Sequence, residues 1–490
     1  MAYAEFPYLS CILMSCVIGV LIMLFTPERH SQAIKWMAAI FSGITLALSL
    51  YLFFAYDKNQ GGLQFVEKVL WVESLGITYF NAVDGFNLPN LLLTGIVFFT
   101  GVLTMWEMQT RVKEFYVLYF VMVSGVFGLF MSMDLFFIFV WYDVSLFPMY
   151  LLIAVWGTTR KEYAAMKLTL YLLAGSALIL PAIVYLFAKS GMNTFDIVSL
   201  MQPGTFSTDQ QKFAFILLFV GFGILAAVWP FHTWSPVGHV AAPHAVSMVH
   251  AGVLMKIGAF GVLRVAIFLC PEGWKYWSTL MASLAAVGII YGALAGLRQT
   301  DLKYVIGYSS VSHMGIVGLG LATVSVDGLN GAIFQMFAHG VMTALFFSSV
   351  GYIYDRTHTK IIAELGGLSR IMPVASTYFI VAAMASMGIP FLASFWGELM
   401  VFIAAFKTYP VRGALAVCAL VVSALFMLRM IQHTFYGPKN EKYAHLPDVP
   451  FGLGIPRMIL LIVLVAFGLY PTLMFDMIET ASIPFINGLL

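Results

Sequence analysis

Long apolar stretches separated by short polar segments dominate the chain. A helix needs about 20 apolar residues to cross a bilayer, and fourteen stretches approach or exceed that length. They cover roughly residues 7–25, 33–55, 87–106, 115–131, 135–156, 163–188, 211–239, 243–268, 276–297, 303–323, 328–353, 373–406, 411–435 and 456–475. The pattern predicts an all-α polytopic membrane protein. Its longest polar interruption, residues 56–84, predicts a surface hairpin.

Composition supports this class and excludes others. The chain is 61% hydrophobic and only 10% charged, whereas soluble proteins carry roughly a quarter of charged residues. A net charge of +2 gives no basic surface for nucleic acid. No C-x-x-C pair occurs among the four cysteines, so a disulfide framework, a structural zinc site and a thiolate-bound cluster are not expected: Cys11, Cys16, Cys270 and Cys418.

Lysine and arginine are unequally shared between the two sets of loops. Alternate loops hold fourteen on one side and seven on the other, and four lie within spans, which accounts for all 25. Cytoplasmic loops carry the excess of these residues. The first set of loops is therefore predicted to be cytoplasmic, with both termini on the opposite side.

Four charged residues lie well inside predicted spans: Asp143, Lys167, Lys256 and Glu398. A charge near the bilayer centre costs a few kcal/mol at least, and such residues usually face a protein interior or a hydrated cavity. A buried ion pair that only joins helices is one interpretation. A proton or cation path is the favoured one. Arg264 and Arg429 are expected to extend toward span ends instead.

Histidines and their polar neighbours favour a proton path. His250, His313 and His339 fall inside spans, and three more surround a helix break. Histidine changes charge near neutral pH and can relay protons. Gln335, His339 and Thr343 follow at i, i+4 and i+8, and further polar side chains share helix faces at Ser309 with His313 and at Ser386, Ser394 and Glu398. Such faces predict polar contacts between helices.

Prolines interrupt two predicted spans at corresponding places. Trp229-Pro230-Phe231-His232 interrupts the seventh span and Met387-Gly388-Ile389-Pro390 the twelfth. Broken helices five spans apart are typical of repeated transporter folds. The chain is accordingly divided into residues 1–110 with three helices and the hairpin, two five-helix halves at 111–270 and 271–436, and a last helix in 437–490.

The motifs in this order resemble the antiporter-like, proton-translocating subunits of respiratory complex I (NADH-quinone oxidoreductase), most closely the subunit M branch. They are Val83-Asp84-Gly85, Ser132-Met133-Asp134, Asp143 with Pro148-Met149-Tyr150, Lys161 to Lys167, Pro230-Phe231-His232-Thr233-Trp234, Ala242-Pro243 to Ser247, Val253 to Lys256, Tyr308 to His313, Phe337-Ala338-His339 and Trp396-Gly397-Glu398. The resemblance is clearest from about residue 84 to residue 436. Glu398 favours subunit M, because the other branches usually carry lysine there.

The resemblance implies two inverted five-helix repeats with discontinuous seventh and twelfth helices. It implies a multi-pass subunit of the bacterial inner membrane that moves protons while other subunits carry the redox chemistry. We expect no cofactor or metal in this chain and expect L-, N- and K-like membrane-arm subunits and the lipid bilayer as its partners. The proposed path is Asp143, modulated by Lys167, followed by Lys256, His313, His339 and Glu398.

Two positions depart from the family pattern. The fifth span carries Asp143 where the family usually has glutamate, and Leu225 stands where it usually has lysine. The first half of the path therefore either uses a modified route or serves partly as scaffold. A subunit of an Mrp-type cation/proton antiporter or of a membrane-bound hydrogenase would share the fold and most of these motifs, so both classes remain open.

Overall fold

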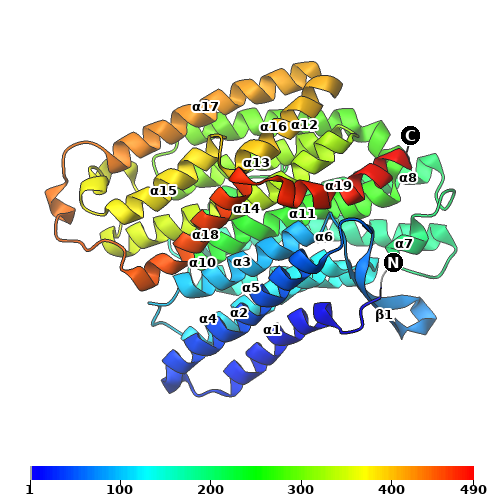
Figure 1. The fold of residues 1–490 in the computed structure, drawn as a ribbon, viewed down its shortest axis with the longest axis horizontal. Helices are drawn as coiled ribbons and strands as arrows, with labels where there is room; N and C mark the ends of the chain where they lie inside the picture. Colours follow the sequence, from blue (N-terminus) through cyan, green and yellow to red (C-terminus); the bar gives the residue numbers. More distant parts are fainter. Residues whose placement is uncertain (1–2, 490) are drawn as a thin grey trace.

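The computed structural model describes residues 3–489 as one bundle of long helices that run in roughly the same direction (Figure 1). The helices of the first six crossings and the linking turn are α1 (Tyr8–Phe25), α2 (Ser31–Ala55), α3 (Leu88–Thr104), α4 (Val112–Met131), α5 (Leu135–Trp156), α6 (Lys161–Ser190) and the short α7 (Ile197–Leu200). Both termini lie at the same end of the bundle (Figure 1), as an even number of crossings requires.

The seventh and eighth crossings depart from regular α-helix. α8 (Thr208–Leu225) and α9 (Trp234–Ala241) are separated by eight non-helical residues, 226–233. The next crossing alternates α-helical and π-helical turns: α10 (His244–Val249), η3 (His250–Leu254), α11 (Met255–Gly261) and η4 (Val262–Ile267). π-helical turns are rare and often mark functional positions.

The remaining helices are α12 (Pro271–Leu297), α13 (Leu302–Ala322), α14 (Val326–Thr357), α15 (Pro373–Ser386), α16 (Ala393–Thr408), α17 (Pro410–Phe435), α18 (Phe451–Leu469) and α19 (Thr472–Asn487). The break between α15 and α16 falls at the predicted place. The last predicted crossing was extended too far, because α18 ends at Leu469 and a separate helix, α19, follows it. Short 3₁₀ turns lie at Glu28–His30, Glu73–Leu75, Ile362–Glu364, Leu368–Arg370 and Glu441–Tyr443.

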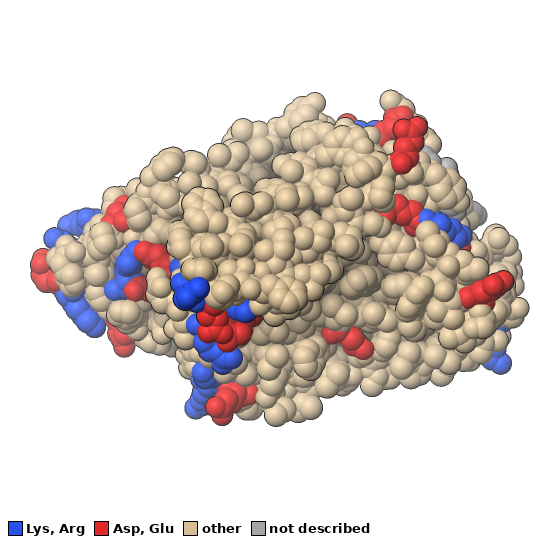
Figure 2. All heavy atoms as spheres, turned by 90° about the horizontal axis from the view of Figure 1, so that it is seen from below, with Lys and Arg blue, Asp and Glu red and all other residues tan. Residues whose placement is uncertain are grey.

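The length and apolar composition of the helices confirm the prediction of a membrane-spanning chain. Within residues 3–489, twelve helices are long and apolar enough to cross a membrane. The other two predicted crossings are the shorter α3 and the pair α15 and α16. Figure 2 shows charged residues gathered mainly toward the two ends of the bundle, with a broad uncharged surface between them. The four-part division of the chain and the inverted relation of its two halves stay predictions.

Residues 64–83 form an antiparallel hairpin of β1 (Gln64–Val72) and β2 (Ile77–Val83), with Val69 opposite Tyr79. Side chains anchor it to the helices. Lys68 Nζ lies 2.7 Å from Asp196 Oδ2. Asp134, the N-cap of α5, accepts hydrogen bonds from the backbone N–H groups of Phe136 and Phe137 on its own helix and from that of Thr78 on β2. This one carboxylate therefore fixes both the start of α5 and the hairpin.

Two buried elements form the centre of the bundle. The eighth crossing and α14 are the only candidate spans in residues 3–489 whose apolar windows are completely buried. Since neither contacts lipid, polar side chains on them meet other helices. Both broken crossings and α13 surround these two elements, and α14 packs against α13, α16 and α10.

Candidate functional site

Four of the predicted path residues form one continuous buried chain. Lys256, on α11, places its Nζ 2.6 Å from His339 Nδ1 on α14, and it also donates to the carbonyl of Ala251. The rings of His339 and His313, which lies on α13, stack with their centroids 5.1 Å apart. Each of these three side chains is at most 2% exposed.

The chain ends at Glu398 on α16. His313 Nε2 lies 3.3 Å from Glu398 Oε1, which also accepts a hydrogen bond from Gln335 Nε2 at 3.2 Å. Glu398 is 2% exposed. A lysine, two histidines and a glutamate from four different helical segments thus meet in one line, and adjacent members lie within direct contact.

Serine hydroxyls orient the second histidine. His313 Nδ1 lies 2.7 Å from the Ser309 carbonyl and 3.3 Å from the Ser309 hydroxyl, which is 3.0 Å from Ser386 Oγ. With Nδ1 held by α13, Nε2 is directed at Glu398. The Thr343 hydroxyl donates to the carbonyls of His339 and Gly340 on its own helix.

The break in the twelfth crossing positions Glu398. α15 ends at Ser386, and Gly388 takes a left-handed conformation with φ +67°. A Cβ atom added to Gly388 would lie 2.6 Å from Glu398 Oε2. Only glycine therefore lets the broken backbone approach the carboxylate so closely, and the predicted break has a direct contact with the end of the chain.

The first half of the predicted path is not assembled in the same way. Asp143, on α5, accepts a hydrogen bond from Ser176 at 3.1 Å. Lys167, on α6, is half-buried, and its Nζ lies 5.9 and 6.0 Å from the rings of Tyr163 and Tyr171. No ion pair joins Asp143 to Lys167 in the part of the chain that the structure describes. Leu225 is buried at the end of α8.

A second histidine cluster lies around α9. His239 Nε2 is 3.0 Å from the Ser235 hydroxyl, and its ring centroid is 4.2 Å from that of His250. Neither nitrogen of His250 has a hydrogen-bond partner among residues 3–489. His232 contacts Tyr291 instead, with ring centroids 4.7 Å apart. In the sequence, His232, His239 and His244 share only their position near a helix break, and the pairing of His239 with His250 was missed.

The expectation that Arg264 extends to a span end is wrong. Its guanidinium is buried and lies 2.7 Å from Asp84 Oδ1, and Phe260 and Phe268 flank it. Asp84 in turn accepts the backbone N–H groups of Phe86 and Asn87. A buried carboxylate was within reach, so the arginine pairs with it and joins the hairpin end of α3 to η4. Arg429 is exposed, as the expectation required.

The model of the family described as "NADH:quinone oxidoreductase/Mrp antiporter, TM" matches residues 132–423, which include every residue of the predicted path. The chain belongs to this family. Family membership confirms the resemblance that the motifs indicated, and it confirms the predicted class of fold.

Known relatives of the family match almost the whole chain. The NAD(P)H-quinone oxidoreductase chain 4 1 of Nostoc sp. is 34% identical over 484 residues, which cover 96% of this chain and 89% of that protein. NADH-quinone oxidoreductase subunit M of Rickettsia prowazekii is 32% identical over 473 residues, covering 95% and 96%. The respiratory complex I structure from Thermus thermophilus contains a chain that superposes with a TM-score of 0.89 at 26% identity, covering 98% of this chain and 99% of that one.

The same fold occurs in other membrane complexes. A chain of the Mrp complex from Dietzia sp. superposes with a TM-score of 0.85 at 20% identity, over 98% of both chains. At this identity the likeness concerns the fold alone. The same fold therefore occurs in membrane complexes of different kinds.

Proposed function

We propose that this chain is a proton-translocating membrane-arm subunit of a complex I-type NADH:quinone oxidoreductase in a bacterial membrane. The relatives of nearly full length that are named as subunits or chains of such oxidoreductases support this proposal. The chain Lys256–His339–His313–Glu398 carries it, because the four groups are ionisable, buried and in sequential contact. L-, N- and K-like membrane-arm subunits are its neighbours in the complex, and other subunits supply the redox chemistry.

Each step of the proposed path moves one proton between neighbouring groups. Lys256 gives a proton to His339 across 2.6 Å, and the neutral amine remains. His339 passes a proton to His313 through a bridging water, because the stacked rings share no hydrogen bond in residues 3–489, and the imidazolium of His313 is stabilised by Glu398 at 3.3 Å. Glu398 then accepts the proton and becomes neutral, which removes the attraction that held charge on His313. A histidine suits the relay because it gains and loses a proton near neutral pH.

The proton leaves on the side opposite to the lysine- and arginine-rich loops. The loops with more lysine and arginine are predicted to be cytoplasmic. Glu398 therefore releases its proton toward the opposite side of the membrane, where both termini lie. Electrostatic interactions couple proton movement in this chain to changes in the neighbouring subunits. A change of charge on a neighbouring subunit's buried groups shifts the proton affinity of Lys256 or Glu398 through a medium of low dielectric, where Coulomb interactions are strong.

Replacing Glu398 with glutamine tests the proposal. Glu398→Gln keeps the size and the acceptor for Gln335 but cannot accept the proton from His313. We expect the assembled complex, in proteoliposomes, to pump fewer protons per electron while the subunit remains in place. Glu479→Gln is the control, because Glu479 on α19 also contacts α14, through Asn330 at 3.4 Å, but lies outside the chain. An unchanged ratio in Glu398→Gln would defeat the proposed role.

A partly non-pumping first half is the second candidate, and one observation favours it. Asp143 contacts a serine rather than a cation, and Leu225 supplies no charge. In this version the half with Asp143 and Lys167 serves as scaffold, while the chain from Lys256 to Glu398 still conducts. Asp143 and Lys167 remain predicted path residues, and replacing Asp143 separates the two versions.

A further inference from the structure

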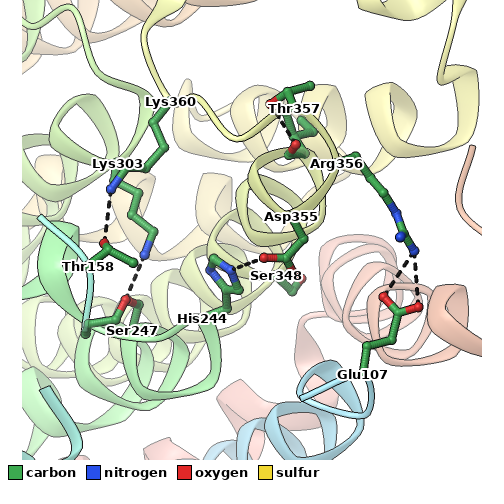
Figure 3. A network of polar contacts seen from close by, with 12 residues as sticks. Glu107, Thr158, His244, Ser247, Lys303, Ser348, Asp355, Arg356, Thr357 and Lys360 are labelled. Carbon is green, nitrogen blue, oxygen red and sulfur yellow. Dashed lines mark hydrogen bonds and ion pairs between the residues drawn. The ribbon is translucent and has the colours of Figure 1, made fainter. Parts of the chain in front are cut away.

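A cavity of about 560 Å³ opens between the α3–α4 loop, the α9–α10 turn and the ends of α14 and α18. Its walls carry polar and charged side chains, among them Glu107, Thr158, His244, Asp355, Arg356 and Arg457. Figure 3 shows His244 and Asp355 directed toward each other, with Arg356 turned outward to Glu107. The cavity lies at the bundle end that the loop charges predict to be cytoplasmic.

His244 and Asp355 form an ionisable pair in this cavity. His244 Nε2 lies 3.1 Å from Asp355 Oδ1, and 12% of the histidine side chain and 51% of the aspartate side chain are exposed. Glycine at 351 makes room for the ring, since a Cβ there would lie 2.5 Å from His244 Cγ. His244 Nδ1 has no hydrogen-bond partner in residues 3–489. One nitrogen thus faces a partly exposed carboxylate, and the other is buried without a partner among the described residues.

One ridge of α14 links this pair to the central chain. Its members are four residues apart, the spacing of the side-chain ridge that winds around a helix, and they are Gln335, His339, Thr343, Phe347, Gly351 and Asp355. Gln335 contacts Glu398, His339 contacts Lys256, and Asp355 contacts His244. From His339 to Asp355 the ridge rises about 24 Å at 1.5 Å per residue, roughly the distance from mid-membrane to one surface.

Phe347 is the bulky apolar member of this ridge between the two ionisable regions. Its ring centroid lies 5.4 Å from that of His239, which is fully buried and touches His250. The cavity floor includes Ala242, immediately after the helix that carries His239. A path inward from His244 therefore meets Phe347 and then a histidine pair that the proposed function has not used.

Two buried basic side chains lie near His244, and each donates to a carbonyl oxygen. Lys303 Nζ donates to the Ala242 carbonyl at 2.8 Å, and the Arg457 guanidinium donates to the Ser348 carbonyl at 2.6 Å. Their charges disfavour a second positive charge on His244, whereas Asp355 favours it.

We propose that this cavity is the proton intake of the central chain, with the His244–Asp355 pair as its first acceptor and Phe347 as the barrier before His239. This inference rests on the proposed function. A proton from water in the cavity binds His244, and Asp355 balances the charge. When the Phe347 ring moves, His244 releases a proton from Nδ1, and Nδ1 of His239, which has no hydrogen-bond partner in residues 3–489, accepts it. The intake replaces the route through Asp143, where the structure assembles no charged pair.

Two substitutions test the first acceptor. Asp355→Asn and His244→Gln keep hydrogen-bonding side chains but remove the ionisable pair. We expect the assembled complex to fall to the ratio of protons per electron measured for Glu398→Gln. Asp327→Asn is the control, since it makes the same change in the first turn of α14, where Asp327 pairs with Lys407 at 2.8 Å.

The possible results distinguish an error in the proposed intake from an error in the proposed function. If both intake variants pump normally while Glu398→Gln does not, the chain conducts but its intake lies elsewhere, and this inference is wrong. If Glu398→Gln pumps normally as well, the proposed function is wrong. If Asp355→Asn retains normal pumping and only His244→Gln loses it, the carboxylate has no part in the acceptor, and the proposed pair is refuted.

The barrier gives a second measurement that does not depend on turnover. Phe347→Ala should raise the passive proton leak of proteoliposomes several-fold, because it opens space between the cavity and His239. Phe346→Ala removes the same ring at the next position, where Phe346 packs on Phe379 with centroids 5.2 Å apart. Equal leaks in the two variants would overturn the barrier role.

Discussion

Gly388 offers a sharp test of whether Glu398 must be held in place. Gly388→Ala adds one methyl group at φ +67°, where its Cβ would lie 2.6 Å from Glu398 Oε2. Favourable contacts between carbon and its neighbours begin near 3.5 Å, so the carboxylate must retreat by roughly 1 Å. Glu398 Oε1 is 3.3 Å from His313 Nε2 at present. This distance is already at the long end of the range for proton transfer, about 2.6–3.2 Å or a bridging water, so a carboxylate displaced by roughly 1 Å no longer meets His313 in the same geometry.

The backbone effect is removed by a matched control. An alanine in the left-handed region costs about 1–2 kcal/mol wherever it is placed. Gly191 ends α6 at φ +65°, and no atom lies within 4 Å of a Cβ added there. Gly191→Ala therefore carries the same backbone cost without a contact to the path.

The assay is protons pumped per electron in proteoliposomes of the assembled complex. We expect Gly388→Ala to approach the ratio of Glu398→Gln and Gly191→Ala to match the wild type. The double variant Gly388→Ala/Glu398→Gln should lose little more than either single variant, because both act on one contact. Equal ratios for Gly388→Ala and Gly191→Ala would refute the reasoning.

Two further changes address the first half and the hairpin. Asp143→Asn should retain most proton pumping, because Asp143 hydrogen-bonds only Ser176 and the cavity beside His244 supplies the protons; a loss as large as that of Glu398→Gln would restore the first half to the path. Burial raises the pKa of Asp134 to about 6, so the folded chain binds this proton more tightly than the unfolded chain and stability is lost as pH rises from about 4 to 6. Asp134→Asn should flatten that part of the profile of thermal inactivation against pH, and an unchanged profile would contradict the assignment.

The sequence is sufficient to predict the crossings and the residues of the central chain. Apolar length identifies a span regardless of its neighbours, because the bilayer requires about 20 such residues. Lys256, His313, His339 and Glu398 could be found because each is an ionisable group in an apolar helix with polar residues at helical spacing. These signals lie in the local sequence, so they can be recognised without knowing how the helices pack.

Pairings between helices could not be predicted in the same way. Asp143 and Lys167 lie on adjacent crossings, which suggested a pair, yet side-chain direction on each helix decides contact, and Asp143 faces Ser176 instead. Arg264 pairs with Asp84 across 180 residues. The i, i+4 ridge of α14 beyond Thr343 also went unnoticed, because Phe347 and Gly351 are apolar and their role depends on the facing histidines.

The buried cations of this chain differ in what balances them, and this difference separates structure from transport. Arg264 faces a carboxylate at 2.7 Å, and losing either partner would leave an uncompensated charge, so the pair is fixed. Lys256 faces only a histidine and a carbonyl oxygen, and no carboxylate lies within 4 Å of it among residues 3–489. Burying a charge without such a partner is unfavourable, whereas burying a neutral amine costs far less. Lys256 therefore holds its proton less firmly than a paired cation does, which is the property that a transfer chain needs and that a fixed ion pair such as Arg264–Asp84 lacks.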